Sequence, residues 1–166
     1  SDLQLNKTYN IASDTVLDLN GHDISSTQGG TLFIVNGGKL TIEGEGTVET
    51  KGRVALARGN GEIIVENGIF ESATSDVIRV EDGTAVINGG DLTGREGAVY
   101  AREGGSTIIV NDGHLTGTDN FAVATNGTNG MGNNHITING GVFEGNIVSS
   151  GYEAICIYIA NDDTFV

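Results

Sequence analysis

A repeat of 22 to 23 residues restricts the fold of this chain more than any other feature. Each repeat shows an apolar residue followed by a short turn rich in Asn, Glu and Gly. This first marker recurs, with steps of 23, 23, 22, 23 and 28 residues, at Leu19, Ile42, Val65, Ile87, Val110 and Ile138. A second apolar marker follows each turn, at Ile24, Val48, Phe70, Leu92, Leu115 and Phe143. A fixed period of this length is typical of a solenoid, in which stacked coils bury each other's apolar faces. We therefore expect equivalent markers of successive repeats to lie opposite each other, Leu19 against Ile42 and so on along the column.

Each repeat also contains a third short apolar segment, so that three extended segments make up one coil. The third segments are 32–35, 54–57, 77–80, 98–101, 121–124 and 154–159. Apolar residues alternate in pairs such as Leu17 and Leu19, which is the period of a half-buried strand. We therefore predict an all-β fold, a right-handed parallel β-helix of about six coils with three short strands per coil. The facing of the third strand stays open, because Arg79 and Tyr100 interrupt its alternation.

Two other folds share parts of this pattern. The pairs Asn20-Gly21 and Asn67-Gly68 are turn signals of antiparallel hairpins. They recur at the coil spacing and at the same corner, however, which favours a solenoid over an antiparallel sandwich. Leucine-rich repeats have a similar period, but their asparagine-centred consensus and helical segment are missing here.

The repeat divides the chain into an N-terminal cap and one β-helix. We expect residues 1–14 to cap the open end and residues 15–166 to form the coils. Insertions at 126–135 and 144–153 break the period, and insertions in solenoids project from the stack and often carry binding. The candidate binding residues in these loops are Asn129, Met131, Asn134, His135 and Tyr152.

The composition excludes several classes of partner. Twenty-two acidic residues against 8 basic ones give a formal charge of −14, which repels nucleic acid phosphates and anionic lipids. No stretch of 18 apolar residues is present that could span a membrane. We expect neither a nucleic acid partner nor membrane insertion. Because the chain starts at Ser1 without a Met, we expect it to be part of a longer protein.

One corner of the coils carries a column of polar residues. It contains Asn20, Glu43, Glu66, Asn88, Asn111 and Asn139. Stacked Asn side chains can hydrogen-bond along such a column, so we predict an amide ladder with a structural role.

Two pairs of glutamates stack on neighbouring coils, Glu43 with Glu66 and Glu49 with Glu71. Two carboxylates about 6 Å apart repel by about 3 kcal/mol at an effective dielectric of 20, so we place both pairs on the outer surface. If the protein is an enzyme, these four glutamates are the candidate catalytic acids. They are also the candidate ligands for Ca²⁺, although the ligand spacing of a known calcium loop is missing, and we expect no other metal or cofactor.

Basic residues gather at the third segments. Arg58, Arg79 and Arg102 can form a small basic patch, and the more economical interpretation is salt bridging to Glu81 and Glu103. The alternative is that this patch supplies the basic residue that a lyase needs.

Three segments resemble a known family: VLDLNGHDIS (16–25), GGKLTIEGEGTV (37–48) and HITINGGVFEGN (135–146). They are similar to the pectin-lyase-like right-handed β-helix domains of bacterial surface adhesins and phage fibres or tailspikes. That family includes lyases, polygalacturonases and tailspike glycosidases. The Asn-Thr-Asp, Gly-His-Gly and Arg-Ile-Lys patterns of polygalacturonases are absent, and without Trp there is no Trp-rich lyase signature. The resemblance implies the fold and leaves the activity open.

The sequence therefore favours a non-catalytic structural or adhesive module. We expect it on a phage virion, as a fibre or capsid appendage, or on a bacterial cell surface, where it binds a host glycan or protein. In a fibre the chain would form a homotrimer or part of a larger virion or surface assembly. The alternative is a tailspike-like polysaccharide hydrolase or lyase, and an excised fragment of a secreted adhesin is a third hypothesis.

Overall fold

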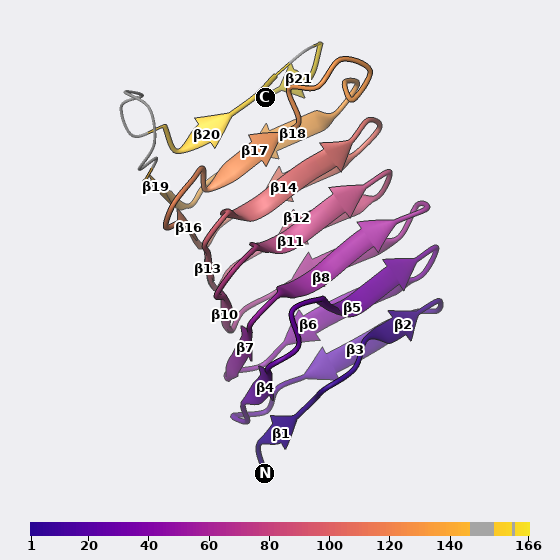
Figure 1. Cartoon of the computed structure of the whole chain (residues 1–166), viewed down its shortest axis with the longest axis vertical. Coiled ribbons are helices and arrows are strands. Elements are labelled where there is room, and N and C mark those ends of the chain that lie inside the picture. The colour runs from indigo at the N-terminus through magenta and orange to yellow at the C-terminus, as the bar shows by residue number, and fades with distance from the viewer. Residues whose placement is uncertain (147–154, 161) are drawn as a thin grey trace.

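Three parallel β-sheets form the walls of the molecule. The structure, a computed structural model, describes residues 1–146, 155–160 and 162–166. The strands stack into a rod, with the N-terminus at one end and the C-terminus at the other (Figure 1). Sheet A contains β1 (Leu3–Gln4), β4 (Ile24–Ser26), β7 (Thr47–Thr50), β10 (Ile69–Ser72), β13 (Asp91–Gly94), β16 (His114–Gly117) and β19 (Val142–Gly145). Sheet B contains β2 (Tyr9–Ile11), β5 (Thr31–Asn36), β8 (Arg53–Arg58), β11 (Asp76–Glu81), β14 (Gly97–Glu103), β17 (Val123–Thr125) and β20 (Ile157–Tyr158). Sheet C contains β3 (Thr15–Asp18), β6 (Lys39–Glu43), β9 (Glu62–Val65), β12 (Thr84–Ile87), β15 (Thr107–Val110), β18 (His135–Ile138) and β21 (Thr164–Phe165).

The chain passes through the three sheets in turn and pairs each strand with the equivalent strand one coil later. This confirms the right-handed parallel β-helix with three strands per coil. Each sheet has seven strands in the described part of the chain, one more than the six repeat markers. The additional strands are β1, β2 and β21, which lie outside the repeats. Residues 1–14, expected as a cap, thus contribute β1 and β2, which pair with β4 and β5.

The repeat markers form the core because alternate side chains of each strand point into the coil. In sheet A the column Ile24, Val48, Phe70, Leu92, Leu115 and Phe143 follows the strand register as predicted. In sheet C, Ile42, Val65, Ile87, Val110 and Ile138 are aligned in the same way. From Ile42 to Val110 these residues are at most 1% exposed.

The predicted register is wrong in the first coil. Leu17, and not Leu19, lies opposite Ile42, and Asp18, and not Asn20, lies opposite Glu43. The cause is a two-residue turn, since Asn20 and Gly21 adopt φ angles of 46° and 75° and the backbone N–H of Asn20 donates to Asp18. This left-handed turn adds residues after β3 and displaces Leu19 into the corner, where it is still buried.

The strands of sheet B place their middle residue on the outer face. Val35, Ala57, Val80 and Ala101 are fully buried, whereas Arg79 and Tyr100 are partly exposed. The open question about the third strand is thus answered, because Arg79 and Tyr100 interrupt the alternation by facing outward. The described part of the chain contains no helix that is long and apolar enough to cross a membrane.

The predicted amide ladder is confirmed. The side-chain amide of Asn139 donates to Asn111, that of Asn111 donates to Asn88, and that of Asn88 donates to the Glu66 carboxylate. The N···O distances between the asparagines are 2.7 Å. Each amide thus donates to the residue one coil earlier in the chain. The ladder ends at Glu66, because a carboxylate accepts hydrogen bonds and has none to donate.

Asn111→Ala is expected to lower the free energy of unfolding by about 1 kcal/mol, because it removes two exposed hydrogen bonds from the middle of the ladder. Urea titration followed by circular dichroism measures this loss. Asn67→Ala, at an exposed turn position of the same corner, is the matched control and should change stability by less than about 0.5 kcal/mol. Equal losses in the two variants would mean that the ladder adds nothing.

Candidate functional site

The outer face of sheet B carries one column of side chains along the rod. Strand register aligns Asn10, Ile34, Leu56, Arg79, Tyr100, Ala124 and Tyr158. After the polar Asn10, the column continues with the apolar Ile34 and Leu56. Charged and aromatic side chains follow at Arg79, Tyr100 and Tyr158. Binding chemistry therefore gathers over β11, β14 and β20.

A cavity of about 310 Å³ opens on this part of sheet B. It is lined by Glu96, Tyr100, Asn120, Phe121, Ala124, Thr125, Gly127 and Tyr158. We call it the aromatic pocket. Pockets that bind small molecules are of this size, mainly apolar or aromatic, with a few polar groups that orient the ligand.

The rings of the aromatic pocket are held in defined positions. Phe121 and Tyr158 stack, with ring centroids 4.9 Å apart and planes inclined by 21°. The guanidinium of Arg79 lies 5.5 Å from the centroid of the Tyr100 ring. Aromatic pairs and cation–π contacts each contribute about 1 kcal/mol, so these rings are ordered before a ligand arrives.

The Tyr100 hydroxyl is available as a hydrogen-bond donor. Burial raises the pKa of this phenol above its usual value of 10.0, and the positive charges of Arg79 and Arg102 oppose that shift. The phenol therefore stays protonated at neutral pH and can donate to a ligand oxygen.

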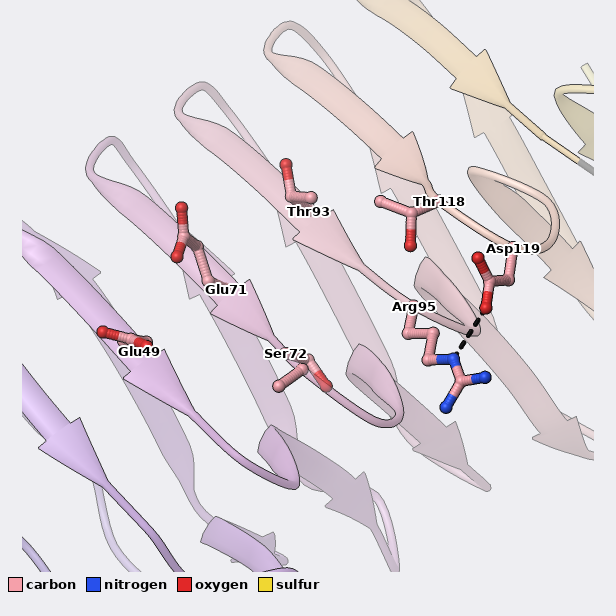
Figure 2. Close-up of a pocket in the computed structure, with 8 residues that line it drawn as sticks. Glu49, Glu71, Ser72, Thr93, Arg95, Thr118 and Asp119 are labelled. Atoms are coloured by element: carbon pink, nitrogen blue, oxygen red, sulfur yellow. Dashed lines mark hydrogen bonds and ion pairs between the residues drawn. The ribbon is translucent and has the colours of Figure 1, made fainter.

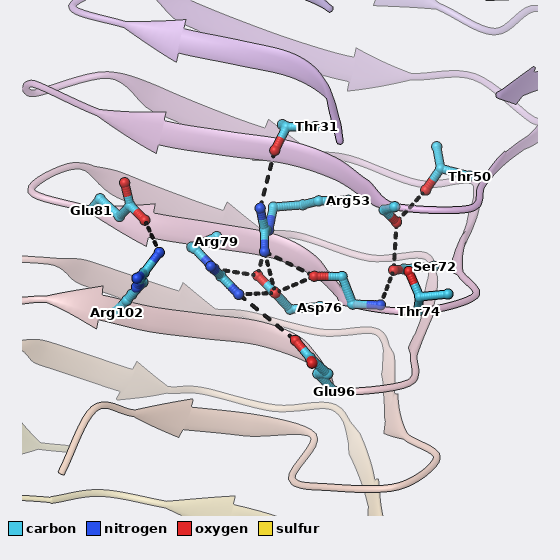
Figure 3. Close-up of polar contacts among 12 residues, drawn as sticks. Thr31, Thr50, Arg53, Ser72, Thr74, Asp76, Arg79, Glu81, Glu96 and Arg102 are labelled. Atoms are coloured by element: carbon cyan, nitrogen blue, oxygen red, sulfur yellow. Dashed lines mark hydrogen bonds and ion pairs between the residues drawn. The ribbon is translucent and has the colours of Figure 1, made fainter. Parts of the chain in front are cut away.

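A buried ion cluster connects the neighbouring strands β8 and β11 of sheet B (Figure 3). The Asp76 carboxylate is 1% exposed and accepts two hydrogen bonds from Arg53, both of 2.8 Å. It accepts two more from Arg79, of 3.2 and 2.6 Å, and one of 2.9 Å from the Ser75 hydroxyl. The arginine side chains are only 14% and 13% exposed. We call Arg53, Ser75, Asp76 and Arg79 the Asp76 cluster.

The Asp76 carboxyl titrates far below the usual range. Burial by itself raises its pKa, but hydrogen bonds and charge from Arg53 and then Arg79 outweigh burial and lower the pKa from 3.8 to about 2. Asp76 is therefore a permanent anion at neutral pH, and two cations share it.

The cluster reaches the aromatic pocket through Arg79. Its Nη2 lies 3.9 Å from the Glu96 carboxylate, which lines the pocket and is 57% exposed (Figure 3). Arg102 pairs with Glu81 at 3.4 Å, as predicted, whereas Arg79 pairs with Asp76 and Glu96 and not with Glu81 or Glu103.

A second hollow, of about 340 Å³, lies on the outer face of sheet A (Figure 2). We call it the acidic groove. Glu49 and Glu71 are opposite each other on β7 and β10 and both line it. Both side chains are exposed, as predicted. An ion pair of 2.6 Å between Arg95 and Asp119 closes the far end.

Glu43 and Glu66 lie elsewhere, on sheet C and at its corner. They follow the register of β6 and β9, and both are exposed. Glu66 accepts the hydrogen bond of the amide ladder, which occupies one of its carboxylate oxygens. The structure thus brings together Glu49 with Glu71 but separates both from Glu43 and Glu66.

The residues predicted in the first loop have different surroundings. Asn129 lines a small polar cavity of about 250 Å³ together with Asp162. Met131 is partly exposed, and His135 is exposed in β18. Asn134 is fully buried, and its side chain bonds to the backbone of Ser106 and Met131 and to Asp163. Asn134 therefore fastens the loop to the coils.

The second expected insertion is described only in part. Glu144 and Gly145, at its start, belong to β19. Tyr152 lies outside the described residues. Among residues 1–146, 155–160 and 162–166, no group of three or more His, Cys, Asp or Glu side chains is placed to hold a metal ion.

The aromatic pocket is the part of the surface that sequence reasoning missed. Tyr100 and Tyr158 share one column, but 58 residues and two insertions separate them, so the period does not align them. A signal did exist at Arg79 and Tyr100, which break the apolar alternation of their strands.

Comparison with known proteins found no match. No family model, no curated protein and no solved structure matches the chain.

Proposed function

We propose that this chain is a non-catalytic binding module that holds a glycan in the aromatic pocket. The observation that carries the proposal is the pocket itself, in which Tyr100, Phe121 and Tyr158 are combined with the polar side chains of Glu96 and Asn120. Aromatic faces pack against the C–H faces of sugar rings, and polar side chains on the rim accept and donate hydrogen bonds to hydroxyls. Tyr100 and Tyr158 lie on strands of sheet B, and Phe121, which precedes β17, stacks on Tyr158.

The setting that suits such a module is the surface of a phage virion or of a bacterium. A rod of stacked coils presents its side faces along its whole length, and the charge of −14 limits association with other acidic surfaces. We propose a host glycan as the ligand, in preference to a host protein, because the pocket is a small hollow and not a wide flat patch. In a fibre, we propose that three copies of the chain associate as a homotrimer.

Tyr158→Ala and Tyr100→Ala are each expected to weaken glycan binding at least tenfold, because truncation removes an aromatic face from the pocket. Isothermal titration of the purified chain with hexasaccharides of gluco, galacto and manno configuration measures this change. Phe165→Ala is the matched control, since Phe165 is an exposed aromatic residue near the same end but outside the pocket. Unchanged affinity in both tyrosine variants, or no binding by the parent chain, would contradict the proposal.

A second candidate function is cleavage of a polysaccharide in the acidic groove, by a hydrolase or a lyase reaction. It rests on the shared position of Glu49 and Glu71 on adjacent strands, because strand spacing is about 4.8 Å and retaining glycosidases place two carboxyls about 5 Å apart. Both side chains are exposed, however, whereas the general acid of a glycosidase lies in a buried, largely apolar environment. Release of reducing ends that is abolished in Glu49→Gln and Glu71→Gln would favour this candidate over the first.

A further inference from the structure

We infer that the aromatic pocket selects uncharged sugars and rejects uronate-bearing ones, and that Glu96 is the residue that sets this preference. The inference rests on the proposed function. It goes beyond that proposal by assigning the chemical class of ligand and a specificity-determining side chain.

The first step is the charge of the lining. Of the eight described residues that line the aromatic pocket, Glu96 alone is charged. Its carboxylate is more than half exposed and can accept hydrogen bonds from ligand hydroxyls. A ligand carboxylate in the same place would lack a proton to donate and would be repelled.

The second step is that the neighbouring cations are already neutralised. Arg53 and Arg79 share the Asp76 carboxylate, and Arg79 also faces Glu96 at 3.9 Å. The two positive and two negative charges of this group therefore balance, and no unpaired arginine is left to attract a uronate. Within the balanced group Glu96 is 57% exposed and Arg79 only 13%, so a ligand in the pocket meets the carboxylate and not the guanidinium. Arg102, on β14, pairs with Glu81.

The third step is the field of the whole molecule. With 22 acidic and 8 basic residues, the chain repels an approaching polyanion at distances of the order of 10 Å at moderate ionic strength. Local and overall charge thus act in the same direction. Uncharged glycans meet neither penalty, and their contact with the rings is unaffected.

The test uses matched ligands that differ only at C6. Neutral gluco, galacto and manno hexasaccharides are titrated beside the same hexasaccharides oxidised at C6 to uronates. We expect the parent chain to bind at least one neutral member roughly tenfold more tightly than its oxidised partner. Raising the salt concentration to 0.5 M should reduce this ratio.

Charge variants assign the preference to Glu96. Glu96→Gln is expected to bring the two affinities within about threefold, and Glu96→Lys to favour the uronate. Glu103→Gln is the matched control, because Glu103 is an exposed acid at the far end of β14, outside the pocket, and its replacement changes the net charge equally. It should leave the ratio near that of the parent chain.

The outcomes separate the two proposals. Equal or tighter binding of the uronates by the parent chain overturns the inference while the glycan-binding function stands. Discrimination that persists in Glu96→Gln, or that disappears equally in Glu103→Gln, overturns the role of Glu96. If neither ligand set binds the folded parent chain, both the proposed function and the inference are wrong.

Discussion

Replacing Asp76 with Ala is expected to lower the free energy of unfolding by about 3–5 kcal/mol. The carboxylate is almost fully buried and receives four hydrogen bonds from two arginines that are themselves largely buried. Without it, Arg53 and Arg79 repel each other and their donors face a cavity. The loss is large because Arg53 is left without its carboxylate partner and Arg79 keeps only the 3.9 Å contact with Glu96. It is not large because the ion cluster was a strong net source of stability.

Urea unfolding of the parent chain and the variant measures this loss. The matched control is Asp119→Ala, which removes a carboxylate that also bonds an arginine, at 2.6 Å from Arg95. Arg95 and Asp119 are 57% and 46% exposed, so we expect this control to cost only a small fraction of the loss in Asp76→Ala. Similar losses in the two variants would show that burial does not set the cost.

The same cluster predicts how stability depends on pH. The pKa of Asp76 is lowered to about 2 in the folded chain from 3.8, so the folded state holds this proton less tightly than the unfolded state. The contribution of Asp76 is therefore complete above pH 3.8 and is lost as the pH falls through about 2. It amounts to about 2 kcal/mol. The difference in unfolding free energy between the parent chain and Asp76→Asn should shrink between pH 5 and pH 2, and a constant difference would contradict the assignment.

The repeat predicted the fold because it records the spacing of coils directly. Apolar residues one coil apart become neighbours in a parallel sheet, so the columns of Val48, Phe70 and Leu92 follow from counting. The amide ladder follows in the same way. Counting fails where a turn adds residues, as the turn at Asn20 and Gly21 does. The distance along the chain between two markers then differs from the distance between residues that are paired in neighbouring strands.

The sites were less accessible to sequence reasoning, for two different reasons. Arg53 and Asp76 are 23 residues apart, so the period by itself could have predicted their contact. The aromatic pocket could not be predicted, because Phe121 precedes β17 and Tyr158 follows two insertions of irregular length. Interactions within the regular coils can thus be read from the sequence, whereas those across insertions depend on how the loops fold.

Phe70→Ala is expected to lower the free energy of unfolding by about 3–5 kcal/mol, through lost burial and the cavity that remains. Phe70 is fully buried in β10, between Val48 and Leu92 of the neighbouring coils. A side-chain atom placed at Gly68 would lie 3.2 Å from its ring, which shows how closely the turn packs against it. The backbone hydrogen bonds between paired strands fix the distance between coils. Neighbouring side chains therefore cannot move in to fill the space.

The adjacent residue supplies the control. Ile69 lies on the same strand but faces outward and is 43% exposed, so Ile69→Ala should cost less than about 1 kcal/mol. Urea unfolding compares the two variants, and equal losses would contradict an inward-facing core column. In a solenoid each coil contacts only its neighbours, so the cavity should weaken the middle of the rod first. Amide hydrogen exchange in Phe70→Ala should accelerate most in β7, β10 and β13, because these strands surround the cavity, and least in β1 and β19 at the ends of sheet A.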